Sequence, residues 1–293
     1  MWKAFGGAAA GILISSFSVL PAAAAEPIPV VAAENFYGEV AAAIGGDKVA
    51  VTSILSSPDQ DPHLFETSPS TARAISGAKL VILNGADYDP WMEKLLEATP
   101  GRDRKVVNAA ALFGKKPGDN PHLWYDPATM PAVAKAVAEA LAAVDPAGTA
   151  GYESARAAFV ATLAPVDAKI AEIKRRFGKA PVTATEPVFG YMADALGLDM
   201  RNLGFQMDVM NETEPSARDI AAMEADLKEK KVRAFFYNSQ VSEPMTEHLK
   251  SLAEAAGVPV VGVTETIPPG MTFPGWMLSQ LDATEKALAG PSS

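Results

Sequence analysis

Cysteine is absent from the 293-residue sequence, and histidine occurs only three times. Without thiols the protein cannot form disulfides, iron–sulfur clusters or a cysteine nucleophile, so any metal site must use histidine, carboxylates or neutral oxygens. Positive charge is also scarce, with 25 Lys and Arg against 35 Asp and Glu and a formal net charge of −10. We therefore expect no nucleic-acid partner, and an acidic surface that attracts cations.

Motifs of common enzyme classes are missing as well. The sequence contains no Gly-x-Ser-x-Gly, no P-loop, no His-Glu-x-x-His and no Gly-x-Gly-x-x-Gly pattern. These patterns position a nucleophile, a phosphate, a catalytic zinc or a dinucleotide in the folds that use them. Their absence favours a protein that is not an enzyme.

Long apolar runs are confined to the N-terminus. Lys3 precedes an apolar stretch over residues 11–20, and the small residues 21–25 end in an Ala-x-Ala pattern before Glu26. This is the layout of a secretory signal peptide, so residues 1–25 are expected to be removed on export to the periplasm. Because no cysteine follows the signal, no lipid anchor is expected on the mature chain.

The rest of the sequence contains a weak internal duplication. Residues 33–45 resemble residues 185–197, since both follow a Val-containing stretch and both end a helical pattern at Gly. Residues 66–70 and 212–216 share a Glu-Thr-x-Pro-Ser pattern, with Pro and Ser in the positions that start helices. A predicted strand follows each copy, at 80–83 and 232–237. The repeat predicts two similar lobes.

Strand and helix patterns alternate along both halves, which predicts an α/β fold with a mostly parallel sheet and flanking helices in each lobe. Further strands are expected at 29–32, 49–54, 182–184 and 258–263. Apolar residues at steps of three and four predict one long linking helix, with Pro165 as a place where it could kink. The expected parts are a signal peptide (1–25), an N-terminal lobe (26–148), the linking helix (149–177) and a C-terminal lobe (178–293).

Two of the three histidines occur in matching sequences, Asp-Pro-His-Leu at His63 and Asn-Pro-His-Leu at His122. A proline disfavours helical backbone in the residue before it, so both histidines are expected on loops. Histidines held on rigid loops suit metal binding, and a matched pair favours that interpretation over two structural histidines. The third, His248, falls in a predicted helix over 243–255 and is expected to face solvent.

Two histidines need carboxylates to complete a metal site. Glu186 and Glu265 follow predicted strands, and ligands of open α/β sheets bind outside the carboxyl ends of strands. Glu34 occupies in the first repeat the place of Glu186 in the second, which makes it a spare candidate. Weaker candidates, for a role beside the ligands, are Asp61, Asp126, Asn238 and Gln240.

At these residues the sequence resembles the periplasmic solute-binding proteins of zinc/manganese ABC importers. The resemblance covers residues 28–290. It rests on five segments, which are Asp61–Ser70, Asn120–Trp124, Thr185–Tyr191, Thr213–Ser216 and Thr264–Glu265, with the closing pair Trp276–Met277. It implies two lobes joined by a rigid helix with the metal between them, a monomer, and an ABC transporter membrane permease as partner.

The resemblance also implies the ligands. His63 and His122 match the two first-lobe histidines, and Glu186 matches a third ligand that is His in zinc-type and Glu in manganese-type members. Glu265 matches the fourth, which is usually Asp, so its longer side chain is a departure. The transported ion is then Zn²⁺ or Mn²⁺. Three alternatives remain at this point: a receptor for a metal chelate or other small solute, a metal-dependent adhesin, and a metal-dependent hydrolase.

Overall fold

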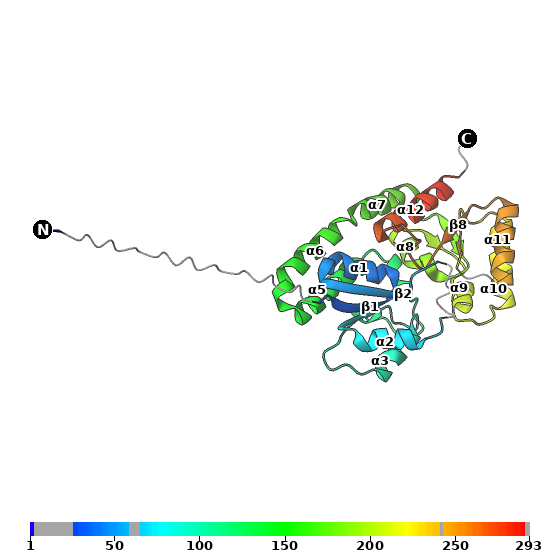
Figure 1. Cartoon of the computed structure of the whole chain (residues 1–293). Helices are drawn as coiled ribbons and strands as arrows, with labels where there is room; N and C mark the ends of the chain where they lie inside the picture. Colours follow the sequence, from blue (N-terminus) through cyan, green and yellow to red (C-terminus); the bar gives the residue numbers. More distant parts are fainter. Residues whose placement is uncertain (3–25, 59–64, 241–242, 291–293) are drawn as a thin grey trace.

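The structure, a computed structural model, describes residues 1–2, 26–58, 65–240 and 243–290. This part of the chain forms two lobes, each built on a four-stranded parallel sheet with helices on both faces (Figure 1). The strand order is β2-β1-β3-β4 in the first sheet and β6-β5-β7-β8 in the second. The expected α/β fold is confirmed, and the common strand order is the one that an internal duplication predicts.

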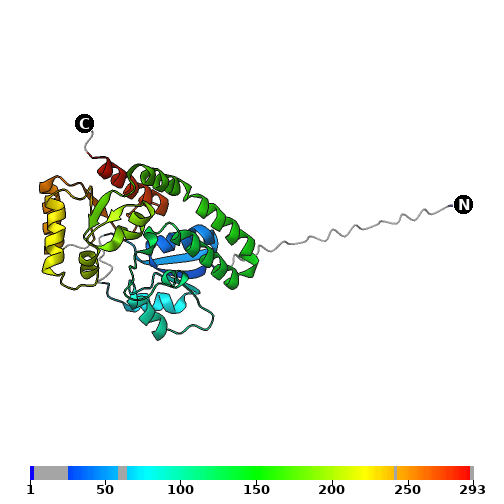
Figure 2. The same cartoon turned by 180° about the vertical axis from the view of Figure 1, so that it is seen from behind.

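The first lobe contains β1 (Ile28–Glu34), α1 (Asn35–Gly45), η1 (Gly46–Lys48), β2 (Val49–Leu55), α2 (Pro69–Gly77), β3 (Leu80–Leu83), α3 (Pro90–Ala98), β4 (Lys105–Asn108), α4 (Ala109–Leu112), η3 (Leu123–Tyr125), α5 (Thr129–Val144) and η4 (Pro146–Gly148). The helices α1 and α5 cover one face of its sheet, and α2 and α3 cover the other (Figure 2). Because both faces are covered, β1 is buried from Val30 onward and reads as a continuous apolar run.

The second lobe contains β5 (Pro181–Ala184), η5 (Pro187–Phe189), α8 (Gly190–Ala195), β6 (Asp199–Met200), α9 (Leu203–Met210), α10 (Ala217–Lys228), β7 (Phe235–Asn238), α11 (Pro244–Ala256), β8 (Val260–Val263) and α12 (Phe273–Ala289). Two strands begin later than expected. Val232 packs into the core before β7 begins, and Pro259, which has no N–H to donate, precedes β8. The short strands β4 and β6 were not expected.

Helix starts in both lobes follow the duplicated pattern. Ser68 caps α2 by accepting a hydrogen bond from the backbone N of Thr71 at 3.2 Å. Ser216 caps α10 in the same way, through the backbone N of Asp219 at 3.2 Å. A serine side chain satisfies one of the N–H groups that a helix start leaves without a partner, so the sequence sets both starts locally.

The expected single linking helix is two helices, α6 (Thr149–Ala161) and α7 (Ala164–Phe177), which follow one another along one side of the molecule (Figure 1). Pro165 has no N–H for the carbonyl of Ala161, and the backbone N of Val166 and of Asp167 instead bond to the carbonyl of Leu163. The apolar stripe keeps its phase across this break, and the buried residues on it include Tyr152, Phe159, Val166, Ile170 and Ile173.

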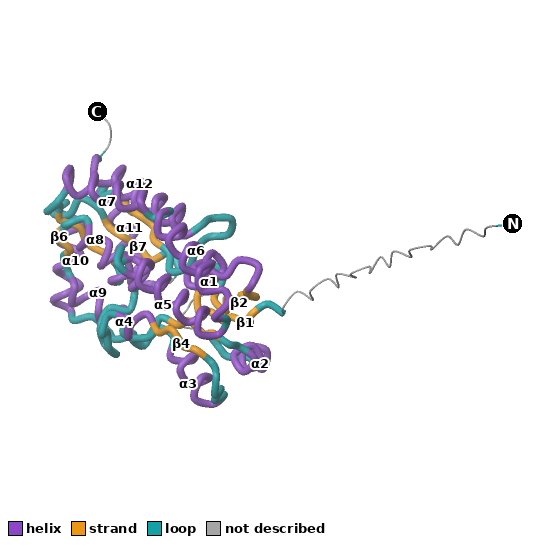
Figure 3. The backbone as a smooth tube through the Cα atoms, turned by 90° about the vertical axis from the view of Figure 1, so that its left-hand side faces the viewer, coloured by secondary structure: helices purple, strands orange, loops and turns teal. Residues whose placement is uncertain are grey.

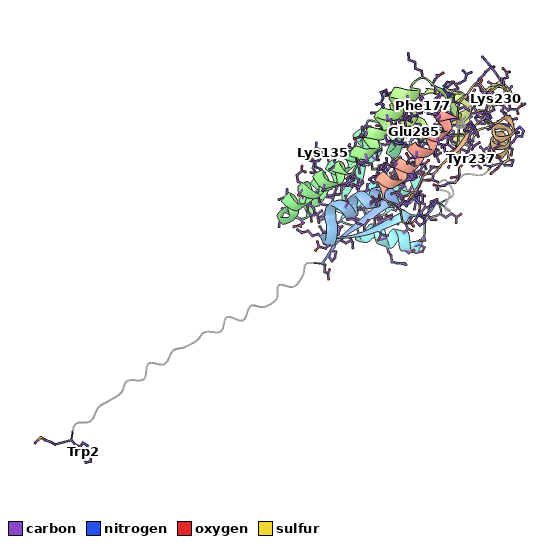
Figure 4. All side chains as sticks on the ribbon, turned by 90° about the horizontal axis from the view of Figure 1, so that it is seen from above. Trp2, Lys135, Phe177, Lys230, Tyr237 and Glu285 are labelled. Carbon is purple, nitrogen blue, oxygen red and sulfur yellow. The ribbon has the colours of Figure 1, made fainter. Side chains whose placement is uncertain are left out.

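Charged residues fasten α7 to α12, which lies beside it (Figure 3). Lys169 on α7 approaches Asp282 at 2.7 Å and Glu285 at 2.6 Å. Glu285, labelled in Figure 4, also pairs with Arg176. Because α7 enters the second lobe and α12 ends it, these pairs fix the linking segment to that lobe.

The two lobes also share buried aromatic side chains. Phe36 of the first lobe stacks with Trp276 of the second, with ring centroids 6.2 Å apart. Tyr125 of the first lobe meets the edge of Phe189 of the second at 5.3 Å. All four side chains are fully buried in one continuous core cluster. A shared core of this kind resists a wide hinge motion, so the lobes are held in one relative position.

In the part of the chain that the structure describes, no helix has the length and apolar character needed to cross a membrane.

Candidate metal centre

Three strand ends of the second lobe bring polar side chains together at the edge that faces the first lobe. Asn238 ends β7, Glu186 follows β5, and Glu265 follows β8. All three are almost completely buried. The side-chain N–H₂ group of Asn238 donates to Oε1 of Glu265 at 2.7 Å and to Oε1 of Glu186 at 3.2 Å. One amide therefore holds both carboxylates in place.

The turn that carries Glu265 is fastened separately. Oε1 of Gln240 accepts hydrogen bonds from the backbone N–H groups of Glu265 and Thr266. Oδ1 of Asn238 accepts from the backbone N of Gln240 at 3.1 Å, which links this turn back to β7. The Glu265 side chain is thus positioned from both its backbone and its carboxylate.

His122 approaches the same carboxylates from the first lobe. Its side chain is fully buried, and Nε2 lies 3.5 Å from Oε2 of Glu265. The edge of its ring contacts Trp124, with centroids 5.3 Å apart. Nε2 has no hydrogen-bond partner among the described residues. A buried imidazole nitrogen directed at a carboxylate is an arrangement that a cation between the two would stabilise.

Asn120 determines which nitrogen of His122 carries the proton. Its Nδ2 donates to the carbonyl of Pro187 at 2.8 Å, so the other amide atom, Oδ1, faces His122. That oxygen accepts from the backbone N of His122 at 3.1 Å and lies 2.7 Å from Nδ1 of the ring. Because an amide oxygen only accepts, Nδ1 carries a hydrogen, and in the neutral imidazole Nε2 is then the nitrogen with the lone pair. Nε2 is therefore the nitrogen that can bind a metal.

Glu34 ends β1 and has a different environment from Glu186. It is fully buried, and burial followed by the nearby charge of Asp89 raises its pKa well above the usual value. Asp89 accepts hydrogen bonds from the backbone N of Asn84 and of Gly85, both at 2.7 Å, and burial raises its pKa to about 6. Two buried carboxyls that face each other favour a protonated Glu34, and a neutral carboxyl is a poor metal ligand.

The remaining sequence candidates are placed as follows. His63 and Asp61 lie outside the described residues. His248 is 58% exposed and lies 3.4 Å from Glu224, which confirms its expected surface position. Within the described ranges, no group of three or more His, Asp or Glu side chains is close enough to hold a metal ion.

A cleft of about 780 Å³ opens beside this centre. Tyr88, whose ring meets His122 edge-on at a centroid distance of 6.0 Å, is one of the residues that line it. Three carboxylates line the cleft against a single Lys94, and one of them comes from the second lobe. They are Glu66, Asp87 and Glu212. A cleft with this balance of charge attracts cations.

Comparison with known proteins decides the family. The profile described as "Zinc-uptake complex component A periplasmic" (ZnuA) matches residues 30–287. The chain belongs to the ZnuA family. It is therefore a solute-binding protein of metal ABC importers, as the sequence resemblance implies.

Two proteins to which this ZnuA family member is similar differ in the metal that their names specify. The manganese ABC transporter substrate-binding lipoprotein PsaA of Streptococcus pneumoniae is 25% identical over 268 residues, covering 85% of this chain and 83% of its own length. The iron ABC transporter substrate-binding lipoprotein MtsA of Streptococcus pyogenes serotype M1 is 26% identical over 294 residues, covering 91% of each chain.

Solved structures share the fold of this ZnuA family member. The periplasmic zinc binding protein TroA from Treponema pallidum superposes with a TM-score of 0.75 at 21% identity, over 89% of this chain and 99% of that one. This similarity establishes the two-lobe architecture.

Asn120 was not among the functional residues expected from the sequence, although the Asn-Pro-His pattern contains it. The signal was its spacing. A side chain two residues before a histidine can reach back to the ring and to the backbone of that histidine, as Asn120 does. No local sequence pattern predicts its bond to Pro187, because the two residues are 67 positions apart.

Proposed function

We propose that this protein captures a divalent transition-metal ion, Zn²⁺ or Mn²⁺, between its lobes and delivers it to the membrane permease of an ABC importer. The proposed ligands are His63 and His122 of the first lobe with Glu186 and Glu265 of the second. The observation that carries the proposal is the buried His122, whose free Nε2 lone pair lies 3.5 Å from the Glu265 carboxylate.

The chemistry of these side chains supports a transition metal. Two imidazoles and two carboxylates without a thiolate form a set of intermediate hardness, which suits manganese, iron or zinc. Two carboxylates also balance the double charge of the ion. By the general order of affinities, zinc would bind more tightly than manganese at equal concentration. The metal that is transported then depends on which ion is available outside the cytoplasm.

Burial supports a bare ion over a chelate. His122 and Glu265 are fully buried and Glu186 is 3% exposed, so an organic ligand around the metal would have to displace packed side chains. Four protein ligands from two lobes also favour a closed site. A hydrolase needs an open coordination position for an activated water, which this ligand set does not favour.

The signal peptide completes the proposal. Residues 1–25 are expected to be removed, so that the mature chain begins at or near Glu26 and acts as a monomer outside the cytoplasm. N-terminal sequencing of exported protein tests the cleavage site. Retention of Met1 would contradict it.

Metal binding is tested on the chain from Glu26, stripped of metal and verified as apo protein. Saturating Zn²⁺ or Mn²⁺ should stabilise the fold by about 4 kcal/mol at a thousandfold excess over Kd, because only the folded state brings the ligands together. His122→Ala should abolish most of this thermal shift. His248→Ala is the matched control, since His248 is exposed and should leave the shift unchanged. An unchanged melting curve of the wild type in saturating metal would refute the proposed function.

A further inference from the structure

We propose that Asn120 is a positioning residue that couples the two lobes to the metal ligands. It selects the metal-binding tautomer of His122 and, through the same amide, holds the loop that follows Glu186. This inference rests on the proposed function, because it assigns a role to a residue beside two proposed ligands.

The side-chain amide of Asn120 bonds to residues of both lobes. Oδ1 contacts the backbone N and the ring Nδ1 of His122, at 3.1 and 2.7 Å. Nδ2 donates to the carbonyl of Pro187 at 2.8 Å, and Pro187 is the residue that directly follows Glu186. The bond to Pro187 fixes the orientation of the amide, since a rotated amide would place an oxygen against a carbonyl oxygen. The second lobe therefore determines which atom of Asn120 the histidine meets.

The surrounding contacts make room for this bond and reinforce it. The hydroxyl of Tyr191 donates to the backbone carbonyl of Asn120 at 2.7 Å, so the two lobes meet twice at this residue. A Cβ atom at Gly190 would lie 3.0 Å from Nδ2 of Asn120, which is too close for an ordinary contact. Glycine at position 190 thus permits the amide to reach the second lobe.

A second contact between the lobes provides a comparison. Asn35 donates to the carbonyl of Ile267 at 2.9 Å and accepts from the backbone N of Ile267 at 3.0 Å. This pair holds the turn after Glu265 and, within the described ranges, makes no hydrogen bond to a histidine. Asn120 is thus the residue that joins contact between the lobes to the state of a ligand nitrogen, and we expect its loss to change both the tautomer and the metal affinity.

The test compares Asn120→Ala, Asn120→Asp and Tyr191→Phe with wild type. Nitrogen NMR of the His122 ring in metal-free protein reports the tautomer, and competition with a metal chelator reports Kd for Zn²⁺ and Mn²⁺. Asn120→Ala should populate both tautomers and weaken binding about 10- to 100-fold, the usual loss when the partner of a ligating histidine is removed. Tyr191→Phe keeps the amide, and should leave the tautomer unchanged and Kd within about twofold.

Asn120→Asp separates the two roles of the amide and covers the case in which the alanine variant fails to fold. Aspartate keeps an oxygen for Nδ1 of His122 but turns a second oxygen towards the carbonyl of Pro187. The hydrogen should therefore stay on Nδ1, while loss of the bond to Pro187 should lower the melting temperature of the metal-free variant.

Two results would overturn the proposal. One is an unchanged tautomer with an unchanged Kd in Asn120→Ala, or, if that variant does not fold, loss of the Nδ1 hydrogen in Asn120→Asp. The other is a wild-type melting temperature of metal-free Asn120→Asp, which would remove the role of the bond to Pro187. If wild type binds neither metal, the proposed function fails, and the tautomer in metal-free protein still decides whether Asn120 positions His122.

Discussion

Asn238→Asp should destabilise the metal-free protein, although the side chain at position 238 keeps almost the same size. The substitution replaces the NH₂ group of Asn238 with an oxygen, and that group donates to both Glu265 and Glu186. The other oxygen remains available to the backbone N of Gln240. The variant therefore isolates one change, the conversion of a shared hydrogen-bond donor into a third buried carboxyl.

The magnitude follows from the two bonds that are lost. A hydrogen bond to a charged group contributes about 1.5–3 kcal/mol, so two of them contribute about 3–6 kcal/mol. The variant can limit the loss by binding a proton, because three adjacent buried carboxylates raise one another's pKa. We therefore expect the lower end, about 3 kcal/mol near pH 7.5, which corresponds to a melting temperature about 6–12 °C lower for a chain of this size.

The assay is thermal unfolding of metal-free wild type and Asn238→Asp at pH 7.5 and pH 5.5. The deficit of the variant should shrink at pH 5.5, since the added carboxyl folds in its protonated form there. Saturating metal should also reduce the deficit, because a divalent cation offsets the added negative charge. Asn211→Asp is the matched control, because Asn211 is exposed and bonds only to the carbonyl of Met207. Equal stability of wild type and Asn238→Asp at pH 7.5 would refute the reasoning.

Three further predictions concern the proposed ligands and their neighbours. Glu34→Gln should stabilise metal-free protein at pH 8 relative to wild type and have less effect at pH 5, as measured by urea unfolding. Burial and the charge of Asp89 raise the folded-state pKa of Glu34, so wild type loses stability as pH rises through that value. A parallel pH dependence of the two proteins would contradict this. Glu186→Ala should lose metal affinity with an unchanged circular dichroism spectrum. Glu186→His should shift preference from Mn²⁺ towards Zn²⁺ in a competition titration, because imidazole is softer than carboxylate. Wild-type metal binding by Glu186→Ala would remove this residue from the ligand set. Metal affinity should fall at least about tenfold between pH 7.5 and pH 5, because protons compete with metal for His63 and His122; equal Kd values by titration at the two pH values would mean that the histidines are not ligands.

The sequence by itself determined the repeated α/β topology and the starts of two corresponding helices. Ser68 and Ser216 start corresponding helices through bonds to residues three positions away. Alternation of strand and helix patterns was enough to predict both parallel sheets, because side-chain periodicity and backbone sterics act over a few residues. Two expectations about local structure needed correction, since Pro165 divides the linking segment and Pro259 delays β8.

Only the tertiary structure distinguished Glu34 from Glu186, which occupy equivalent places in the repeat. Glu34 faces Asp89 in a fully buried site, whereas Glu186 accepts a hydrogen bond from Asn238. It also revealed the bond from Asn120 to Pro187, which fixes the orientation of the amide that faces Nδ1 of His122. These contacts join residues far apart in the chain, and each depends on how the lobes pack. The charge of a buried carboxyl and the tautomer of a buried histidine are set by such neighbours, which no local sequence pattern specifies.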